Sequence, residues 1–147
     1  MVMKKQLKNN TIFIDSDAFI AIAKEDDINH DKAIHILNRL LGQTVSFVTS
    51  NYVFSESVTV ISQRVGHKEA VVFANNLKST KSPFLIERIN EETEDLALSI
   101  FTKQVSKNIS FVDCTNMALL NRLSIDYIFS FDKVYKKNGY KLVEELI

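Results

Sequence analysis

The sequence predicts an α/β protein of three layers, in which a mainly parallel sheet of about five strands lies between helices. Apolar, β-branched segments alternate along the chain with segments whose apolar residues recur at helical spacing. Strands separated by helices favour a parallel sheet that is covered on both faces. With 147 residues, of which 46% are hydrophobic, and only three glycines and one proline, the chain fits a single domain over residues 1–147.

The first half of the chain contains two of the expected strands. The expected elements are a strand at 11–14, a short helix at 17–23, a helix at 30–41, a strand at 44–49 and a helix at 51–65. The residues expected to cap or stop these helices are Ser16 or Asp17, Asn29, Gly42, Ser50 and Gly66. The apolar side expected on the helix at 30–41 comprises Ala33, Ile34, Leu37, Leu40 and Leu41. Because the strand at 11–14 is apolar almost throughout, we expect it at the buried centre of the sheet.

The second half continues the alternation. The expected elements are a helix at 67–77, a strand at 84–89, a helix that starts after Asn90, an apolar run at 109–112 interpreted as a strand, a helix at 113–123, a strand at 126–132 and a short strand at 140–143. Pro83 precedes the strand at 84–89 and predicts that this strand lies at an edge of the sheet. The apolar stripe expected after Asn90 comprises Leu96, Ile100, Phe101 and Val105.

The composition excludes several classes of protein. The formal net charge is zero, so contact with nucleic acid would have to use a local basic patch. Cys114 is the only cysteine, which excludes an intramolecular disulfide and favours a buried thiol in a reducing compartment. Residues 1–10 carry lysines without the apolar stretch of a signal peptide, and no later run has membrane-spanning length. We therefore expect a soluble, cytoplasmic protein.

Four acidic residues stand at positions that could bring them together. Asp15, Asp113 and Asp132 each follow an apolar run, and parallel strands would deliver all three to one edge of the sheet. Glu56 lies within the helix at 51–65. Its neighbours three and four positions away are Tyr52, Val53, Thr59 and Val60. A carboxylate among such side chains needs a partner, so the sequence predicts one acidic cluster.

An acidic cluster of this kind predicts a divalent cation. Carboxylates within a few ångströms of one another repel, and the pKa of some of them rises. A cation removes that repulsion, and oxygen ligands without His or Cys favour Mg²⁺ or Mn²⁺. Such a cation can activate a bound water and neutralise charge on a phosphate, which is the chemistry of phosphodiester hydrolysis. The residues expected to bind the metal and to be catalytic are Asp15, Glu56, Asp113 and Asp132.

Each of these residues also has a structural interpretation. Glu56 could lie at a solvent boundary or pair with Arg64, and each of the three aspartates could cap a helix or turn. The residues that could support the acids by hydrogen bonds are Ser16, Asp17, Ser110 and Thr115, with solvated capping as the alternative for Asp17. The lysines that could meet an RNA backbone, or form a solvated basic face, are Lys133, Lys136, Lys137 and Lys141. The histidines share no metal-ligand spacing and are interpreted as structural or surface residues.

Four motifs in order give the chain a resemblance to the PIN-domain family, especially to its small VapC-type toxin ribonucleases. They are IFIDSDAFIAI with Asp15, TSNYVFSESVTVI with Glu56, SFVDCTNMALL with Asp113, and YIFSFDKVYKKNGY with Asp132. This resemblance covers essentially the whole chain. It implies a PIN-like fold with five parallel strands, cleavage of RNA with Mg²⁺ or Mn²⁺ held by these acids, hydroxyl groups beside them at Ser16 and Ser110, frequent homodimers, and an antitoxin partner.

The chain departs from the family pattern at one place. Two residues after the fourth acid the family often has Asp or His, whereas Val134 stands here, with Tyr135 in the usual aromatic position. The resemblance therefore extends to the role of Asp132 less fully than to those of the first three acids.

Two other classes of function compete with a ribonuclease. The phrase IFIDSDAF resembles the DxD motif of haloacid-dehalogenase-type phosphatases, with Asp15 as nucleophile and Asp17 as acid, but nothing in the chain resembles GDxxxD. A phosphoacceptor receiver domain would explain acids at strand ends and would leave Glu56 without a role. The other alternative is a catalytically silent PIN-like module that binds RNA or a protein, which a metal titration would distinguish from an enzyme.

Overall fold

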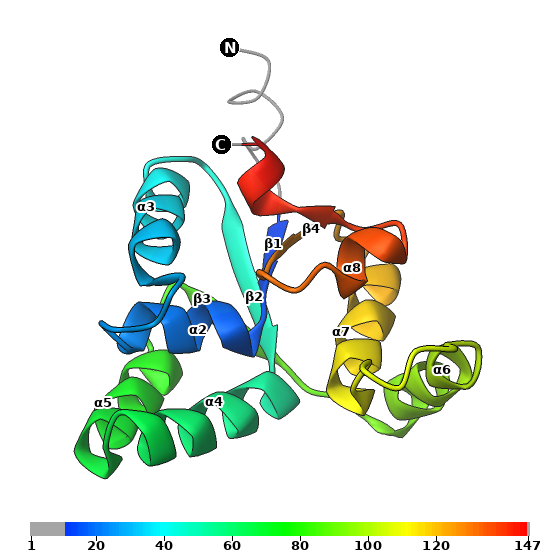
Figure 1. Cartoon of the computed structure of the whole chain (residues 1–147), viewed down its shortest axis with the longest axis horizontal. Coiled ribbons are helices and arrows are strands. Elements are labelled where there is room, and N and C mark those ends of the chain that lie inside the picture. Colours follow the sequence, from blue (N-terminus) through cyan, green and yellow to red (C-terminus); the bar gives the residue numbers. More distant parts are fainter. Residues whose placement is uncertain (1–10, 147) are drawn as a thin grey trace.

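The computed structural model describes residues 11–146, which form a sheet flanked by helices (Figure 1). The strands are β1 (Thr11–Ile14), β2 (Ser46–Ser50), β3 (Phe84–Glu87), β4 (Tyr127–Phe129) and β5 (Lys141–Leu142). The helices are α2 (Ser16–Ala23), α3 (His30–Leu41), α4 (Asn51–Arg64), α5 (His67–Lys78), α6 (Glu91–Thr102), α7 (Phe111–Arg122), α8 (Val134–Lys137) and the 3-10 helix η1 (Val143–Leu146). The lysine-bearing segment 1–10, expected to contain no signal peptide, lies outside the described residues.

The sheet confirms the predicted fold class. Its strand order is β3-β2-β1-β4-β5, and every neighbouring pair is parallel. Phe13 of β1 is aligned with Val48 of β2 on one side and with Ile128 of β4 on the other, so β1 is central, as expected. β3 lies at an edge, which agrees with the prediction made from Pro83. Figure 1 shows α2, α3 and α5 on one side of the sheet and α6 and α7 on the other.

The centre of the core is the part of the chain where the sequence is most apolar. Ile12, Phe13 and Ile14 of β1 are at most 1% exposed, and they belong to one buried core with Ile128 and Phe129 of the neighbouring strand β4. Burial of each such side chain contributes about 1.5–3 kcal/mol relative to exposure. This rigid centre fixes the end of β1, from which the chain continues directly into Asp15.

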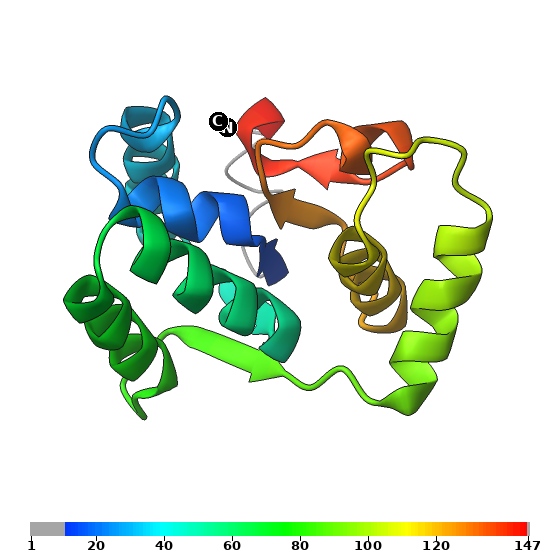
Figure 2. The same ribbon diagram turned by 60° about the horizontal axis from the view of Figure 1, so that its bottom comes forward.

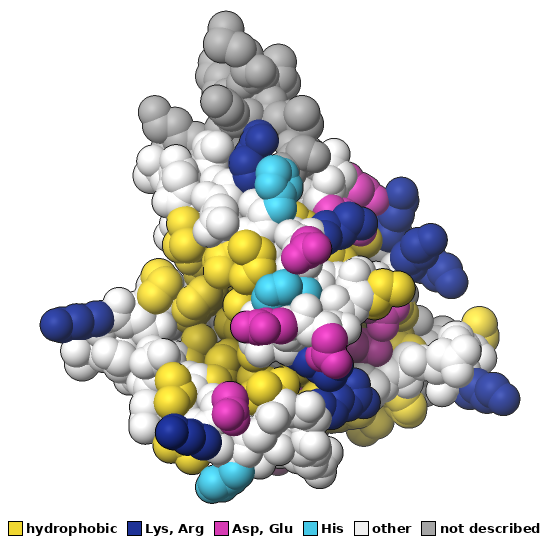
Figure 3. All heavy atoms as spheres, turned by 60° about the vertical axis from the view of Figure 1, so that its left-hand side comes forward, with side chains coloured by type: hydrophobic (Ala, Val, Ile, Leu, Met, Phe, Trp, Pro, Cys, Tyr) yellow, Lys and Arg dark blue, Asp and Glu magenta, His cyan; other side chains and the backbone are white. Residues whose placement is uncertain are grey.

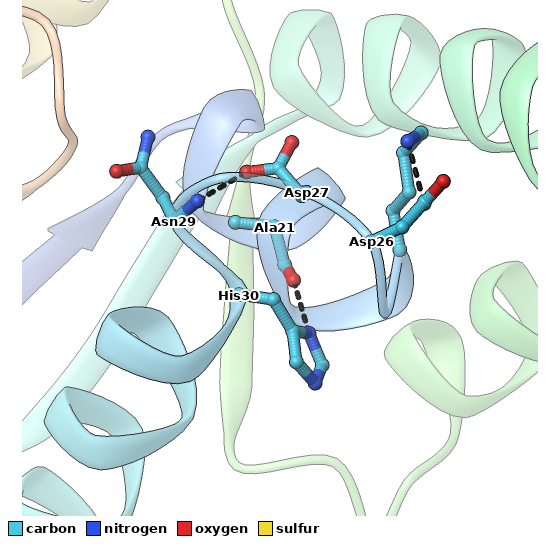
Figure 4. Close-up of polar contacts among 6 residues, drawn as sticks. Ala21, Asp26, Asp27, Asn29 and His30 are labelled. Atoms are coloured by element: carbon cyan, nitrogen blue, oxygen red, sulfur yellow. Dashed lines mark hydrogen bonds and ion pairs between the residues drawn. The ribbon is translucent and has the colours of Figure 1, made fainter.

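The expectation that the Asn29 side chain caps α3 is wrong. Asn29 precedes α3, but its side chain makes no capping hydrogen bond. Figure 4 shows that the Asn29 N–H instead donates to the Asp27 carboxylate at 2.8 Å. The His30 ring nitrogen Nδ1 lies 2.7 Å from the Ala21 carbonyl oxygen. His30 thus ties α3 to α2, which agrees with the structural interpretation of this histidine.

Some residues expected on apolar faces are exposed. Leu41 is 52% exposed, and Ile36 is buried in its stead, because α3 is rotated relative to the expected face. Phe101 of α6 is 40% exposed, and Val105 is fully exposed because α6 ends at Thr102. Across residues 11–146, none of the helices combines the length and the apolar content that crossing a bilayer requires.

Candidate active site

Asp15 is the central residue of the acidic cluster. It follows β1 directly, is 5% exposed and forms the N-cap of α2, where the sequence predicted Ser16 or Asp17 as the cap. The Ser16 N–H donates to Asp15 Oδ1 at 2.7 Å, and the Ser130 hydroxyl donates to Oδ2 at 3.1 Å. The capping interpretation of Asp15 is therefore correct, and it coexists with a position inside the cluster.

A tyrosine hydroxyl joins Asp15 to Asp113. The Tyr135 hydroxyl lies 2.8 Å from Asp15 Oδ2 and 3.1 Å from Asp113 Oδ1. A phenol has one hydrogen, so it donates to only one of the two carboxylates at a time. The fully buried Asn116 fixes the hydroxyl, because its Nδ2 donates to Tyr135 at 2.9 Å and to Asp15 Oδ1 at 3.1 Å. Two carboxylates that are far apart in the sequence thus face one hydroxyl.

Asp113 lies in the first turn of α7, which corrects the strand expected at 109–112. Ser110 is the N-cap of α7, and its hydroxyl accepts the Asp113 N–H at 3.0 Å. The Asp113 carboxylate accepts the Ser110 N–H at 2.9 Å, which completes a capping box. Ser110 therefore supports Asp113 by hydrogen bonds, as expected. Thr115 does not support an acid, because its hydroxyl donates to the Val112 carbonyl.

Glu56 is exposed on α4, which corrects its expected place on an apolar face. Its Oε2 accepts a hydrogen bond of 2.7 Å from the Ser16 hydroxyl. The alternative in which Glu56 lies at a solvent boundary is thus correct, with Ser16 rather than Arg64 as its partner. Because Ser16 is adjacent to Asp15, this bond places Glu56 at the margin of the cluster.

Asp132 is at the other margin of the cluster. It is exposed, and its carboxylate accepts the Val134 N–H at 3.0 Å, as expected for a residue that caps a turn. Its own N–H donates to the Ser130 hydroxyl at 3.1 Å. The Ser130 hydroxyl oxygen lies 3.1 Å from Asp15 Oδ2 and equally far from Asp17 Oδ2. Asp132 therefore connects to Asp15 through Ser130.

Asp17 belongs to the cluster and is not a solvated cap. Its Oδ2 accepts the Phe131 N–H at 2.8 Å. Burial raises the pKa of Asp17 to about 6, although its hydrogen bonds oppose the rise. Burial, followed by the charge of Asp17, raises the pKa of Asp15 to about 8. Both carboxyl groups are therefore poorly stabilised as bare anions, and each would gain from a proton or a cation.

The residues present fit a hard cation by their chemistry. Every acid of the cluster offers oxygen, and Mg²⁺ and Mn²⁺ prefer oxygen ligands. Two buried oxygen atoms, Asp17 Oδ1 and Asn116 Oδ1, accept no hydrogen bond within the described part of the chain. Among residues 11–146, however, no three His, Cys, Asp or Glu side chains lie close enough together to hold one ion. The structure brings Asp15 and Asp113 together around one hydroxyl, and it leaves Glu56 and Asp132 at the margins.

Two surface hollows open at the margins of the cluster. One, of about 350 Å³, contains Glu56 and lies between α4 and Val112 of α7. The other, of about 330 Å³, contains Asp132 and lies between the segment after α6 and α8. A chain of hydrogen bonds runs from the first hollow to the second through Ser16, Asp15 and Ser130. Figure 2 looks onto the side where α4 and α7 face each other across the end of β1.

Three polar residues of this cluster were not predicted from the sequence. Asn116 and Ser130 contact Asp15, yet neither was a candidate, and position 135 was identified only as an aromatic. A sequence signal existed for two of them, because Asn116 interrupts the run CTNMALL and Ser130 interrupts YIFSF. A polar side chain inside an apolar run needs a buried partner, which here is Asp15.

Comparisons with known proteins identify the family to which the chain belongs. The family model described as the PIN domain matches residues 12–139. The chain is 28% identical over 130 residues to the 23S rRNA-specific endonuclease VapC20 of two Mycobacterium tuberculosis strains. The matched region covers 88% of this chain and 95% of the relative. The crystal structure of Mycobacterium tuberculosis VapC20, described as a sarcin-ricin loop cleaving toxin, matches with a TM-score of 0.79 at 24% identity, over 88% of this chain and 95% of that one. The chain therefore belongs to the PIN-domain family, and the resemblance to VapC-type toxin ribonucleases predicted from its sequence is confirmed.

Proposed function

We propose that this protein is a divalent-metal-dependent endoribonuclease, the toxin of a toxin–antitoxin pair, and that Asp15, Glu56, Asp113 and Asp132 form its metal-binding and catalytic site. Nuclease activity follows from membership of the PIN-domain family and from similarity to a VapC endonuclease. PIN-domain nucleases as a family use divalent metal ions, and the oxygen ligands present support Mg²⁺ or Mn²⁺. The observation that carries the site is the buried Asp15 carboxyl, with its pKa raised to about 8, beside Asp113.

The acids of the cluster would have two different roles in hydrolysis, which are binding of the cation and activation of the attacking water. Asp15 and Asp113 would hold the cation, since the Tyr135 hydroxyl keeps their carboxylates side by side. A bound divalent cation would supply an activated water and neutralise charge on the phosphate. Glu56 and Asp132 lie at the two open margins, where a substrate and solvent can reach them. Each can accept a proton from an attacking water or orient that water.

We propose 23S rRNA as the first substrate to examine. The relative with 28% identity is named as a 23S rRNA-specific endonuclease, and its crystal structure is described as that of a sarcin-ricin loop cleaving toxin. Hollows on both sides of the cluster support a substrate strand that continues past the cut in either direction, as an internal loop of RNA requires.

An antitoxin belongs to the same proposal. Figure 3 shows the face of the molecule that carries α2, α3 and α5, and hydrophobic side chains gather on this face. An apolar hollow of about 210 Å³ on these elements includes Phe19, Leu37 and Phe73 among its lining residues. Exposed apolar surface of this kind marks contacts with other proteins. An arginine of such a partner that reached the acids would replace the charge of the cation and block water activation.

The test of this function is cleavage of RNA by matched variants. A 23S rRNA fragment with the sarcin-ricin loop is incubated with wild type, Asp15→Asn, Asp113→Asn and Asp26→Asn, each with Mg²⁺, Mn²⁺ or EDTA. Asp26 is an exposed carboxylate paired with Lys24 outside the cluster, so its variant is the control. We expect metal-dependent cleavage that falls roughly a hundredfold or more in the first two variants only. Cleavage that persists in EDTA, or that survives Asp113→Asn, would refute the proposal, and binding without cleavage by wild type would favour the silent module.

The partner and the oligomer need separate measurements. Expression of the wild-type chain alone is expected to slow growth, and co-expression of the neighbouring gene is expected to relieve it. Growth that is unaffected by the wild-type chain would contradict the toxin assignment. We also propose a homodimer, which light scattering on the purified chain would confirm or exclude.

A further inference from the structure

The hollow beside Asp132 is lined by lysine and amide side chains, and these residues have no role in the proposed binding of metal by the acids. We name it the lysine hollow and define it by its lining residues. These are Gln104, Val105, Ser106, Asn108, Ile109, Asp132, Lys133, Val134, Lys137 and Asn138. Two cationic side chains, three side-chain amides and one hydroxyl thus surround a space that begins at one acid of the cluster. Its volume of about 330 Å³ is within the range of small-ligand sites.

The two lysines of this hollow differ from the other two lysines of the same region. Lys136 pairs with Glu145 at 2.9 Å, and the Lys141 ammonium lies 5.6 Å from the centre of the Tyr127 ring. Within the described residues, neither Lys133 nor Lys137 forms an ion pair. They are four positions apart at α8, which places them on one face of that turn. Of these four lysines, the described contacts therefore leave Lys133 and Lys137 available to a ligand.

The hollow is held in shape by hydrogen bonds between its walls. The Gln104 side chain donates to the Asn138 side chain at 3.0 Å, which ties the segment after α6 to the end of α8. The Asn138 side chain also donates to the Val134 carbonyl at 2.9 Å. Because these bonds exist without a ligand, little ordering of the walls is needed when one enters.

The hollow at Glu56 has a different character. It is lined by Tyr52, Val60 and Val112 together with hydroxyl groups, and it contains no cationic side chain. Of the two hollows that a polynucleotide crossing the cluster would meet, the one at Asp132 is therefore the one whose lining includes cationic side chains. Phosphate groups are the part of RNA that lysines recognise.

We infer that the lysine hollow binds the RNA nucleotide next to the scissile phosphate on the Asp132 side, with Lys133 and Lys137 neutralising its phosphate. This inference rests on the proposed ribonuclease function and adds a substrate subsite to it. The amides of Gln104, Asn108 and Asn138 stand beside the lysines, where they can donate to and accept from a base edge. The fully exposed Val105 at the rim offers an apolar contact to a base.

The experiment measures RNA binding in EDTA, so that no cleavage occurs. Fluorescence anisotropy with a labelled RNA hairpin of the sarcin-ricin loop gives Kd at several salt concentrations for wild type, Lys133→Gln, Lys137→Gln and Lys136→Gln. The slope of log affinity against log salt counts the phosphate contacts. We expect this slope to fall by about 0.7–1 in each hollow variant. Lys136→Gln removes the same charge one residue away and is expected to keep the wild-type slope.

The possible results separate this inference from the proposed function. Equal slopes for wild type and both hollow variants, or an equal fall in the Lys136→Gln control, would overturn the subsite while leaving metal-dependent cleavage intact. If the hollow variants bind RNA normally but lose affinity for the antitoxin, the hollow serves a protein partner and the inference is wrong. A wild-type chain that does not bind the hairpin would refute the subsite and also count against the proposed substrate.

Discussion

Replacement of Tyr135 by phenylalanine tests how the acidic cluster is positioned. Tyr135 is fully buried, so its ring would remain packed in the variant and only the hydroxyl would be lost. That hydroxyl contacts Asp15 and Asp113 and accepts a hydrogen bond from Asn116. Without it, the two carboxylates lose the group they share, and Asn116 keeps only Asp15 as an acceptor. We predict that Tyr135→Phe folds but binds metal more weakly.

The magnitude follows from the kind of hydrogen bond that is removed. Above about pH 8, where Asp15 is ionised, a hydrogen bond to this charged group contributes about 1.5–3 kcal/mol, which in a protein of this size corresponds to a fall in Tm of roughly 3–12 °C without metal. Residues that orient metal ligands typically change affinity by about 10–100-fold when mutated. Isothermal titration with Mn²⁺ should therefore give a Kd at least about 10-fold higher for Tyr135→Phe than for wild type. Excess Mg²⁺ should restore cleavage, because the ligands themselves are retained.

Tyr140→Phe provides the matched control. Its hydroxyl donates to Asn121 at 2.7 Å and lies outside the acidic cluster, so the same chemical change should leave the Kd for Mn²⁺ unaltered. A Tyr135→Phe variant that binds Mn²⁺ as tightly as wild type, or more tightly, would refute the reasoning. Tighter binding would mean that the hydroxyl competes with the cation for Asp15.

Two further predictions concern stability. Because the pKa of Asp15 is raised to about 8, the folded state binds a proton that the unfolded state has lost above the ordinary value of 3.8. The free energy of unfolding of the metal-free protein should therefore fall as pH rises from about 4 to 8, and Asp15→Asn should make it depend less on pH. A Tm in EDTA that rises over this pH range would contradict this prediction. Phe13→Ala, at the centre of the sheet, should destabilise the fold by about 3–5 kcal/mol in urea unfolding, and a loss under about 1 kcal/mol would show that the core collapses into the cavity.

The parts of the fold that the sequence could predict are those governed by local signals. The apolar run Thr11–Ile14 was long enough to identify the central strand. Ser50 was identified as the cap of α4 because serine is a preferred residue at that position, where its hydroxyl accepts a backbone N–H. Pro83 similarly indicated the edge strand. Each of these three predictions used residues that are close together in the sequence, within a single strand or a single helical turn.

The errors arose where long-range packing decides the outcome. The run before Asp113 was taken for a strand, because short apolar segments look alike whether they end a strand or begin a buried helix. α7 is buried from Cys114 to Leu120, so it has no polar face that would reveal a helical period. Tyr135 is 120 positions from Asp15, and no local pattern connects two residues at that separation.

The parallel order of the strands has a consequence for how the protein is made. Asp15 lies near the start of the described chain, but β4 and Tyr135, which complete its surroundings, come more than a hundred residues later. At translation rates of about 5–20 residues per second, roughly 6–24 s pass between synthesis of Asp15 and synthesis of Tyr135. During that interval β1 lacks its neighbour β4, and Asp15 lacks the groups that hold it beside Asp113. A growing chain therefore carries the acids of the cluster without the arrangement that joins them, and the ribosome that makes it is not exposed to an assembled nuclease until β4 and α8 have emerged.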